Sequence, residues 1–252
     1  MNEQSYNNIP AVRRSDLWEI RKSPAHYLYK VTHPEEPTAA LLFGTAAHKY
    51  ILEPDTFWDD YIEMPKIDRR TKAGKEEWQR ILDSGKTPIS ADDMAVIRDM
   101  DAQIKAHPMA AALLKTGRHE VPIEWTDEKT GERCKCRPDV ITEFDGEDWI
   151  VDYKTTTSCM DGAFEKSCKM YGYKLQAAMY TEGLLNTSLT SARFAFVAQE
   201  KNPPYAVRVY KCDPWFVEEG GDLFRELIEK LHKCKETGEW PGYEDKELVG
   251  DE

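Results

Sequence analysis

In the first half of the chain, apolar residues recur at the spacing of an α-helix. The clearest case is residues 91–114, where an apolar residue returns every three or four positions. Residues 38–53 predict a second helix, made of small and apolar residues, which ends before Pro54. An earlier helix follows the capping residues at 14–16, and Pro24 either interrupts it or starts the next helix.

From residue 119 onwards, the pattern changes to the alternation of apolar and polar residues that is typical of β-strands. Five strands are predicted, at residues 119–126, 132–143, 149–154, 193–199 and 205–210. Residues 127–131 and 144–148 predict tight turns between the first three strands. Helices follow at 160–185 and 213–235. This order predicts an α/β core in which a central mixed sheet is flanked by helices.

Length and composition favour a single domain over residues 1–252, with 40% hydrophobic and 11% aromatic residues. The polar segments 1–10 and 244–252 are expected to be flexible tails. No apolar run reaches the roughly 18 residues of a membrane span, and the N-terminus lacks the apolar core of a signal peptide. A cytoplasmic location, without a membrane partner, is therefore expected.

The charge and the cysteines restrict the chemistry. A formal net charge of −12 argues against a protein that coats nucleic acid through bulk charge. It permits a local basic groove, or a site where a divalent metal supplies positive charge. The six cysteines form no paired C-x-x-C sets, so reduced, partly buried thiols are expected rather than a zinc or iron–sulfur site.

Two acidic residues and a lysine occupy neighbouring predicted strands. Because side chains alternate along a strand, Asp152 and Lys154 point to one face and Tyr153 points to the other. Asp139 follows Pro138 on the preceding strand, and the tight turn allows the two strands to pair. Two carboxylates that converge repel each other unless a cation lies between them. Mg²⁺, which prefers oxygen ligands, is the common intracellular choice.

These residues resemble the PD-(D/E)xK nuclease superfamily, in which a Pro-Asp pair, a turn and Asp-x-Lys follow one another. The sequence GTAAH at 44–48 resembles the G-x-x-x-H helix of the exonuclease branch, and Gln176 and Tyr180 fit its Q-x-x-x-Y helix motif. Residues 15–29 resemble the N-terminal helix of phage exonucleases similar to RecE, also called exonuclease VIII. Residues 64–78 resemble their basic arm.

The resemblance implies a restriction-endonuclease-like α/β core and a role for each matched residue. Asp139 and Asp152 would bind metal, together with the backbone carbonyl of Tyr153. Lys154 would be the catalytic lysine, and His48 would be a metal ligand or would position a second metal. Two ions, Mg²⁺ or alternatively Mn²⁺, would stabilise the attacking and leaving oxygens of phosphodiester hydrolysis.

Further residues are candidates beside this core. Glu120 and Glu124 are four apart and share one strand face, so either is a candidate for an additional acidic ligand. The resemblance favours Glu120. Gln176 and Tyr180 lie one helical turn apart. They are expected to contact the DNA or to hold Lys154, the alternative being helix packing alone.

Several residues are candidates for contacts with the DNA backbone. Arg137 precedes the Pro-Asp pair, and Thr155 offers a hydroxyl to a phosphate. Residues 64–80 are interpreted as a basic arm, and its cations are Lys66, Arg69, Arg70, Lys72 and Lys75. The alternative for this cluster is a solvated charged face.

With the resemblance, the sequence predicts a metal-dependent exodeoxyribonuclease similar to RecE. The resemblance implies double-stranded DNA ends as the substrate and digestion of the 5′ strand, which leaves a 3′ single-stranded tail. It also implies a single-strand annealing partner similar to RecT, a role in DNA recombination in a bacterial or phage-infected cell, and a homo-oligomeric ring such as a tetramer.

Two alternatives are retained. A nuclease of the Cas4 or AddB type would need four cysteines around an iron–sulfur cluster, one of them well before the core, and no cysteine precedes Cys134. A non-catalytic DNA-binding module on the same fold would be expected to have lost a core residue. All four of His48, Asp139, Asp152 and Lys154 are present.

Overall fold

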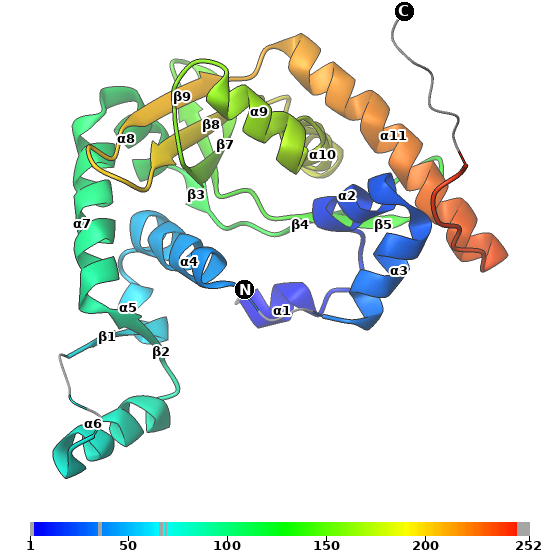
Figure 1. The fold of residues 1–252 in the computed structure, drawn as a ribbon. Helices are drawn as coiled ribbons and strands as arrows, with labels where there is room; N and C mark the ends of the chain where they lie inside the picture. Colours follow the sequence, from blue (N-terminus) through cyan, green and yellow to red (C-terminus); the bar gives the residue numbers. More distant parts are fainter. Residues whose placement is uncertain (1–2, 35–36, 66–67, 69, 246–252) are drawn as a thin grey trace, which may run out of the picture.

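A five-stranded mixed sheet forms the centre of the computed structural model, which describes residues 3–34, 37–65, 68 and 70–245 (Figure 1). The strands lie in the order β3 Arg118–His119, β6 Val140–Phe144, β7 Glu147–Thr156, β8 Arg193–Glu200 and β9 Val207–Lys211. β7 pairs with β8 in parallel, and the other neighbours pair antiparallel. The mixed sheet predicted from the order of elements is therefore confirmed.

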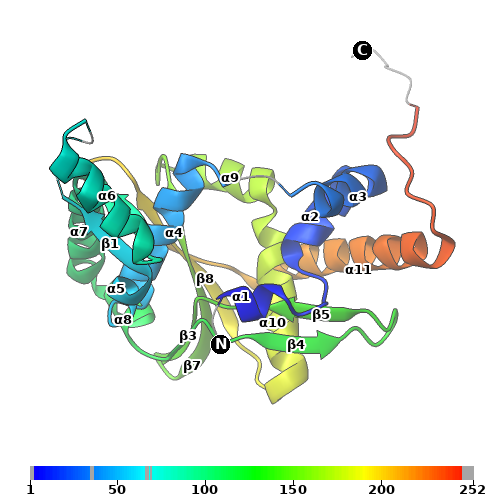
Figure 2. The same ribbon diagram turned by 90° about the horizontal axis from the view of Figure 1, so that it is seen from below.

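Helices cover both faces of this sheet (Figures 1 and 2). One face is covered by α9 Ala163–Tyr171, α10 Tyr173–Ser188 and α11 Pro214–Thr237, and the other by α7 Ala91–Ala106 and α8 Pro108–Lys115. Along β7, Ile150 packs into the core of the first face, and Val151 and Tyr153 pack into the core of the second. Because both of its faces are buried, the middle of this strand is almost continuously apolar.

The N-terminal helices follow the predicted pattern. They are α2 Arg14–Lys22, α3 Pro24–Thr32 and α4 Ala39–Leu52. Pro24 starts α3, and the side chain of Ser23 caps it by accepting a hydrogen bond from the N–H of His26. Thr38 caps α4 in the same way. The Thr38 cap fixes where α4 begins, and α4 carries one of the predicted site residues.

A proline and a glycine divide two helices that the apolar pattern predicts as continuous. The helix predicted at 91–114 is two helices, because Pro108 cannot continue the hydrogen bonding of α7 and instead starts α8. The helix predicted at 160–185 is divided at Gly172, whose φ of +70° lies in the left-handed region. α9 and α10 therefore meet at a bend that lies beside β7.

Two predicted strands are each divided between two sheets. Residues 119–126 contribute β3 to the central sheet and β4 Ile123–Thr126 to a separate two-stranded sheet. Residues 132–143 likewise contribute β5 Arg133–Cys136, which pairs with β4, and then β6. The second break falls at Pro138, since proline cannot donate to a regular ladder. Both breaks lie next to the site described below.

A smaller unit extends from one side of the sheet (Figure 1). It consists of α5 Phe57–Asp60, β1 Tyr61–Met64, α6 Lys72–Asp83 and β2 Thr87–Ser90. β1 and β2 pair in parallel, although neither is predicted by an alternating pattern. α6 forms the outer end of the unit, away from the central sheet.

The chain ends only partly follow the expectation of flexible tails. α1 Glu3–Asn7 is a short helix within the predicted N-terminal tail, and Tyr6 on this helix is buried. Of the predicted C-terminal tail, residues 246–252 lie outside the described part of the chain. Buried contacts hold the described part of this N-terminal segment against the rest of the protein.

All six cysteines are free, and all except the half-buried Cys212 are buried, as expected for reduced thiols. Within the described residues, no helix combines the length and the apolar character that crossing a membrane requires.

Two adjacent glycines in α11 test how closely this helix packs on α10. A Cβ at Gly220 would overlap the backbone carbonyl of Lys174, whereas a Cβ at Gly221 would meet nothing within 4 Å. We expect Gly220→Ala to lower the free energy of unfolding by about 1–3 kcal/mol, because the helices must separate. Gly221→Ala should raise it by roughly 0.5–1 kcal/mol through helix propensity. Urea unfolding measures both, and equal stability of the two variants would contradict the close packing.

Candidate active site

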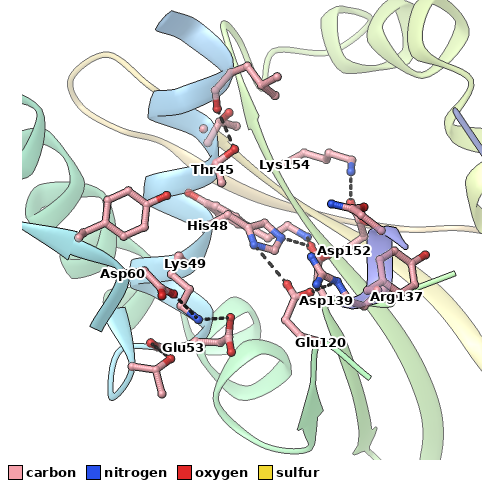
Figure 3. Close-up of a pocket in the computed structure, with 18 of the residues that line it drawn as sticks. Thr45, His48, Lys49, Glu53, Asp60, Glu120, Arg137, Asp139, Asp152 and Lys154 are labelled. Carbon is pink, nitrogen blue, oxygen red and sulfur yellow. Dashed lines mark hydrogen bonds and ion pairs between the residues drawn. The ribbon is translucent and has the colours of Figure 1, made fainter. Parts of the chain in front are cut away.

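A cleft of about 1160 Å³ lies beside β7, where α4 and the break between β5 and β6 face the strand (Figure 3). All the predicted core residues line it, and so do the residues predicted to contact them: His48, Glu120, Arg137, Asp139, Asp152, Tyr153, Lys154, Thr155, Gln176 and Tyr180. Residues from five separate parts of the sequence therefore meet in one place.

His48, on α4, lies between two carboxylates that come from different segments (Figure 3). Its Nε2 is 2.8 Å from Oδ2 of Asp139, and its Nδ1 is 3.4 Å from Oε1 of Glu120. The same oxygen of Asp139 accepts a hydrogen bond of 2.7 Å from the backbone N–H of Tyr153 on β7. Asp139 therefore joins α4 to the central sheet.

Glu120 reaches the site because the chain turns sharply after β3. Its φ of 51° lies in the left-handed region, and its N–H donates a hydrogen bond of 3.0 Å to the carbonyl of Asp139. The prediction that Glu120 and Glu124 share one strand face is wrong, since the strand is interrupted between them. Glu124 lies on β4, where it is exposed and pairs with Arg133 at 2.8 Å.

The charges of these three groups depend on one another. Burial alone would lower the pKa of His48, but the negative charges of Asp139 and Glu120 outweigh burial and raise this pKa to about 9. Burial would raise the pKa of Asp139, but the charge and hydrogen bond of His48 hold it below its usual value. Burial, followed by the charge of Asp139, raises the pKa of Glu120. At neutral pH, His48 is therefore an imidazolium between two carboxyl groups.

Asp152 and Lys154 form a second pair on β7, and their common face confirms the alternation that the sequence predicts. Nζ of Lys154 lies 2.5 Å from Oδ2 of Asp152 and 5.3 Å from the centre of the Tyr173 ring. Burial and the charge of Asp139 raise the pKa of Asp152, which is only 1% exposed. Burial would lower the pKa of Lys154, but the charges of Asp152 and Asp139 raise it. The lysine is therefore a charged ammonium.

Gln176, on α10, contacts Asp152 rather than Lys154. Its Nε2 donates to Oδ1 of Asp152, and its buried Oε1 has no hydrogen-bond partner in the part of the chain that the structure describes. Tyr180, one turn further along α10, packs edge-on against Phe194 of β8 and also lines the cleft. Gln176 thus fixes the carboxylate that in turn holds the lysine.

Arg137 lies in the break between β5 and β6, and its guanidinium forms an ion pair with a carboxylate. Its Nε is 2.7 Å from Oε2 of Glu120, although the sequence predicts a phosphate contact for it. Its guanidinium is 5.0 Å from the centre of the Tyr6 ring. Tyr6 and Arg14 also line the cleft, and neither is predicted from the sequence as a site residue. No local pattern marks them, since only the fold brings the N-terminal segment to the site.

The cleft also has an acidic side, whose residues the sequence does not predict as part of the site. Lys49 of α4 pairs with Glu53 at 2.9 Å and with Asp60 at 3.3 Å (Figure 3). Asp59 lines the same side. Lys154 lies across the cleft from this group (Figure 3). A phosphate group is therefore favoured on the side of Lys154 and disfavoured on the side of α5.

The predicted basic arm lies apart from this cleft. Lys66 and Arg69 fall outside the described residues. Arg70 forms an ion pair within the arm at 3.0 Å, and Lys72 and Lys75 are exposed on α6. None of these three described cations lines the cleft, so a DNA contact by the arm stays a prediction.

The side chains of His48, Glu120 and Asp139 suit a divalent metal ion. One ligand atom from each lies within 4.8 Å of the others, and imidazole nitrogen and carboxylate oxygen are common ligands of such ions. Asp152, also predicted as a ligand, is not in this group, and its two oxygens face Lys154 and Gln176. The residues present therefore fit one ion most directly at the histidine.

The raised pKa of His48 would make the binding of a metal ion depend on pH. The imidazole keeps its proton until the pH approaches about 9, instead of its ordinary value of 6.5, and a histidine must lose this proton to bind a metal. Between pH 7.5 and 8.5 we expect Mn²⁺ affinity, measured by calorimetry, to rise by up to about tenfold, with one proton released per ion. His48→Gln should flatten this dependence. A wild-type affinity that is constant over this range would contradict the charge state described here.

Comparisons with solved structures agree with the fold. The chain is similar to a protein from Eubacterium rectale named "Putative exonuclease", with a TM-score of 0.69 and 15% sequence identity, over 99% of this chain and 96% of that one. A second structure, of SSO0001, aligns with a TM-score of 0.40 and 14% identity, over 90% of this chain and 81% of that one. Comparison with curated proteins gives no match.

The family comparison covers nearly the whole chain. Residues 14–249 match the family described as "PDDEXK-like domain of unknown function (DUF3799)". The matched range contains Asp139, Asp152 and Lys154, and the mixed sheet with helices on both faces is consistent with this fold. The chain therefore belongs to this family of PDDEXK-like domains, as its resemblance to the PD-(D/E)xK superfamily predicts.

Proposed function

We propose that the protein is a metal-dependent exodeoxyribonuclease that hydrolyses phosphodiester bonds at the ends of linear double-stranded DNA. The observation that carries this proposal is the meeting, in one cleft, of the His48, Glu120 and Asp139 group with the Asp152–Lys154 pair. The PDDEXK-like family and the exonuclease name of the similar Eubacterium rectale protein support it.

His48, Glu120 and Asp139 would hold the metal ion, with Mg²⁺ as the expected ion and Mn²⁺ as an alternative. When bound, a divalent ion neutralises phosphate charge and makes a water molecule more acidic. Asp139 and Glu120 stabilise the proton on His48, so this proton and the ion compete for one place. For a second ion we propose Asp152 and the backbone carbonyl of Tyr153.

Lys154 is the catalytic residue in this proposal. Its ammonium is held by Asp152, and Gln176 orients Asp152, so the charge is fixed before a substrate arrives. A preorganised ammonium offsets the negative charge that develops on a phosphate during hydrolysis, and it also orients the attacking water. Thr155 and Tyr180, which line the same cleft, are proposed contacts for the DNA backbone.

The finer parts of the proposal depend on the resemblance to RecE. They are digestion of the 5′ strand, release of a 3′ single-stranded tail, and use of that tail in recombination by an annealing protein similar to RecT. A homo-oligomeric ring, such as a tetramer, would collect basic residues around the DNA in a chain with a net charge of −12. The basic arm, residues 64–80, is the segment we propose for such contacts.

The structure gives less support to the two alternatives. A nuclease of the Cas4 or AddB type needs a cysteine cluster, and no cysteine belongs to a metal-binding group among the described residues. A non-catalytic DNA-binding module has no need of a buried Asp152 that is held from both sides. Assays of DNA cleavage separate this module from the nuclease.

Linear duplex DNA labelled at the 5′ or the 3′ end tests the proposed activity. In Mg²⁺ we expect early release of the 5′ label and no cleavage of closed circles, because the enzyme requires an end. EDTA should abolish the activity. Lys154→Ala should slow it by roughly 10²–10³-fold, the usual loss for a preorganised charge at the reacting group. Gel analysis of timed samples gives the rates.

The matched control is Lys230→Ala, which removes an exposed lysine of α11 that does not line the cleft. This variant should cleave at the wild-type rate. Early release of the 3′ label would overturn only the polarity. If neither label is released in Mg²⁺ or in Mn²⁺, the nuclease proposal is wrong and the binding module becomes the better account.

A further inference from the structure

The N-terminal segment, residues 3–12, lies beside β5 (Figure 2), and its residues Tyr6 and Asn7 line the cleft. The N–H of Val12 donates a hydrogen bond of 2.8 Å to the carbonyl of Arg133, and the N–H of Lys135 donates one of 2.9 Å to the carbonyl of Val12. These bonds extend the small sheet by one bridge. They place Tyr6, on α1, beside the proposed metal site of His48, Glu120 and Asp139, which is called the metal group below.

Lys135 fastens this segment to β5. Its side chain is only 1% exposed, and its ammonium donates to the backbone carbonyls of Tyr6, Asn7 and Ile9 at 2.7, 3.3 and 2.8 Å. An ammonium group has three protons, and all three are used here. A buried ammonium without partners is costly, so Lys135 and the segment hold each other in place.

The ring of Tyr6 contacts two cations. Nζ of Lys135 lies 4.6 Å from the ring centre, and the guanidinium of Arg137 lies 5.0 Å from it. Both distances are within the ~6 Å over which a cation is attracted to an aromatic face. Tyr6 is buried, so little water weakens this attraction.

Arg137 transmits this constraint to the metal group. Its Nε holds Oε2 of Glu120 at 2.7 Å, which leaves Oε1 facing His48 at 3.4 Å. An ion pair with a guanidinium holds the position of the carboxylate oxygen that it contacts. Without this ion pair, Glu120 would be free to turn away from the negative charge of Asp139.

We propose that Tyr6 is a positioning residue of the metal site and that it acts through Arg137 on Glu120. Lys135 fixes the tyrosine, the tyrosine ring fixes the guanidinium, and the guanidinium presents the carboxylate to the metal. The N-terminal segment is thus a working part of the site. This inference rests on the metal-binding role proposed for Glu120.

Calorimetric titration of the full chain with Mn²⁺, without DNA, tests this role. Tyr6→Leu should weaken Mn²⁺ binding by about fivefold, because the aromatic face that holds Arg137 is lost. Tyr6→Phe keeps that face and should bind within about twofold of the wild type. Lys135→Met removes the bonds to the three carbonyls, so it should act in the same direction as Tyr6→Leu.

Two controls separate positioning from general damage. Tyr210→Leu makes the same change at a tyrosine that also carries an arginine, Arg208 at 5.4 Å, outside the cleft. It should leave Mn²⁺ affinity unchanged. Arg137→Met alone should weaken binding by about tenfold or more. In that background Tyr6→Leu should cause no further loss, since its effect passes through Arg137.

Folded Tyr6→Leu and Lys135→Met proteins that bind Mn²⁺ as tightly as the wild type would overturn the proposal. An additive loss in the Arg137→Met background would overturn the route through Arg137. Weaker Mn²⁺ binding in the variants, with a wild type that cleaves no DNA, would defeat the proposed nuclease function and leave this inference standing. A wild type that cleaves DNA, with unchanged Mn²⁺ affinity in the variants, would defeat this inference alone. A wild type that binds no Mn²⁺ would overturn both.

Discussion

The site depends on the neutralisation of three carboxylates that the fold draws together beside β7. Each carboxylate has a cation of its own, and the pairs are Asp139 with His48 at 2.8 Å, Asp152 with Lys154 at 2.5 Å, and Glu120 with Arg137 at 2.7 Å. A buried charge without a partner costs several kcal/mol. Removing one member of a pair would therefore leave the other member as an unpaired buried charge. The His48–Asp139 pair joins α4 to the break between β5 and β6, and the hydrogen bond from the N–H of Tyr153 to Asp139 joins this break to β7.

The same pairing explains how the acidic cluster is stable without a metal ion and how it would accommodate the ion that we propose. His48 carries the proton that the surrounding carboxylates favour, and this proton supplies the positive charge that a divalent ion would replace. Lys154 keeps its charge in either state, because Asp152 and Asp139 raise its pKa, and Arg137 stays paired with Glu120. The chain therefore presents an ordered lysine and an ordered glutamate before metal or substrate arrives, which is the preorganisation that a hydrolytic site requires.

The central part of the site could be predicted from the sequence, because local periodicity determines it. Alternation along one strand places Asp152 and Lys154 on a common face, and a tight turn brings Asp139 to the neighbouring strand. The position of Glu120 could not be predicted, since a positive φ at a glutamate has no sequence signal. Tyr6 was not predicted, because the contacts that give it its proposed role are made with residues far from it in the sequence. The divided strands and helices show the same limit, since an apolar pattern gives the type of an element better than its ends.

We propose that His48, Glu120 and Asp139 form one binding site for a divalent metal ion. Anomalous scattering from a crystal soaked in Mn²⁺ tests it most directly. We expect an anomalous peak roughly 2.0–2.6 Å from a ring nitrogen of His48 and from carboxylate oxygens of Asp139 and Glu120. A peak elsewhere in the cleft with His48 still bound to Asp139, or no peak in the cleft at saturating Mn²⁺, would contradict it.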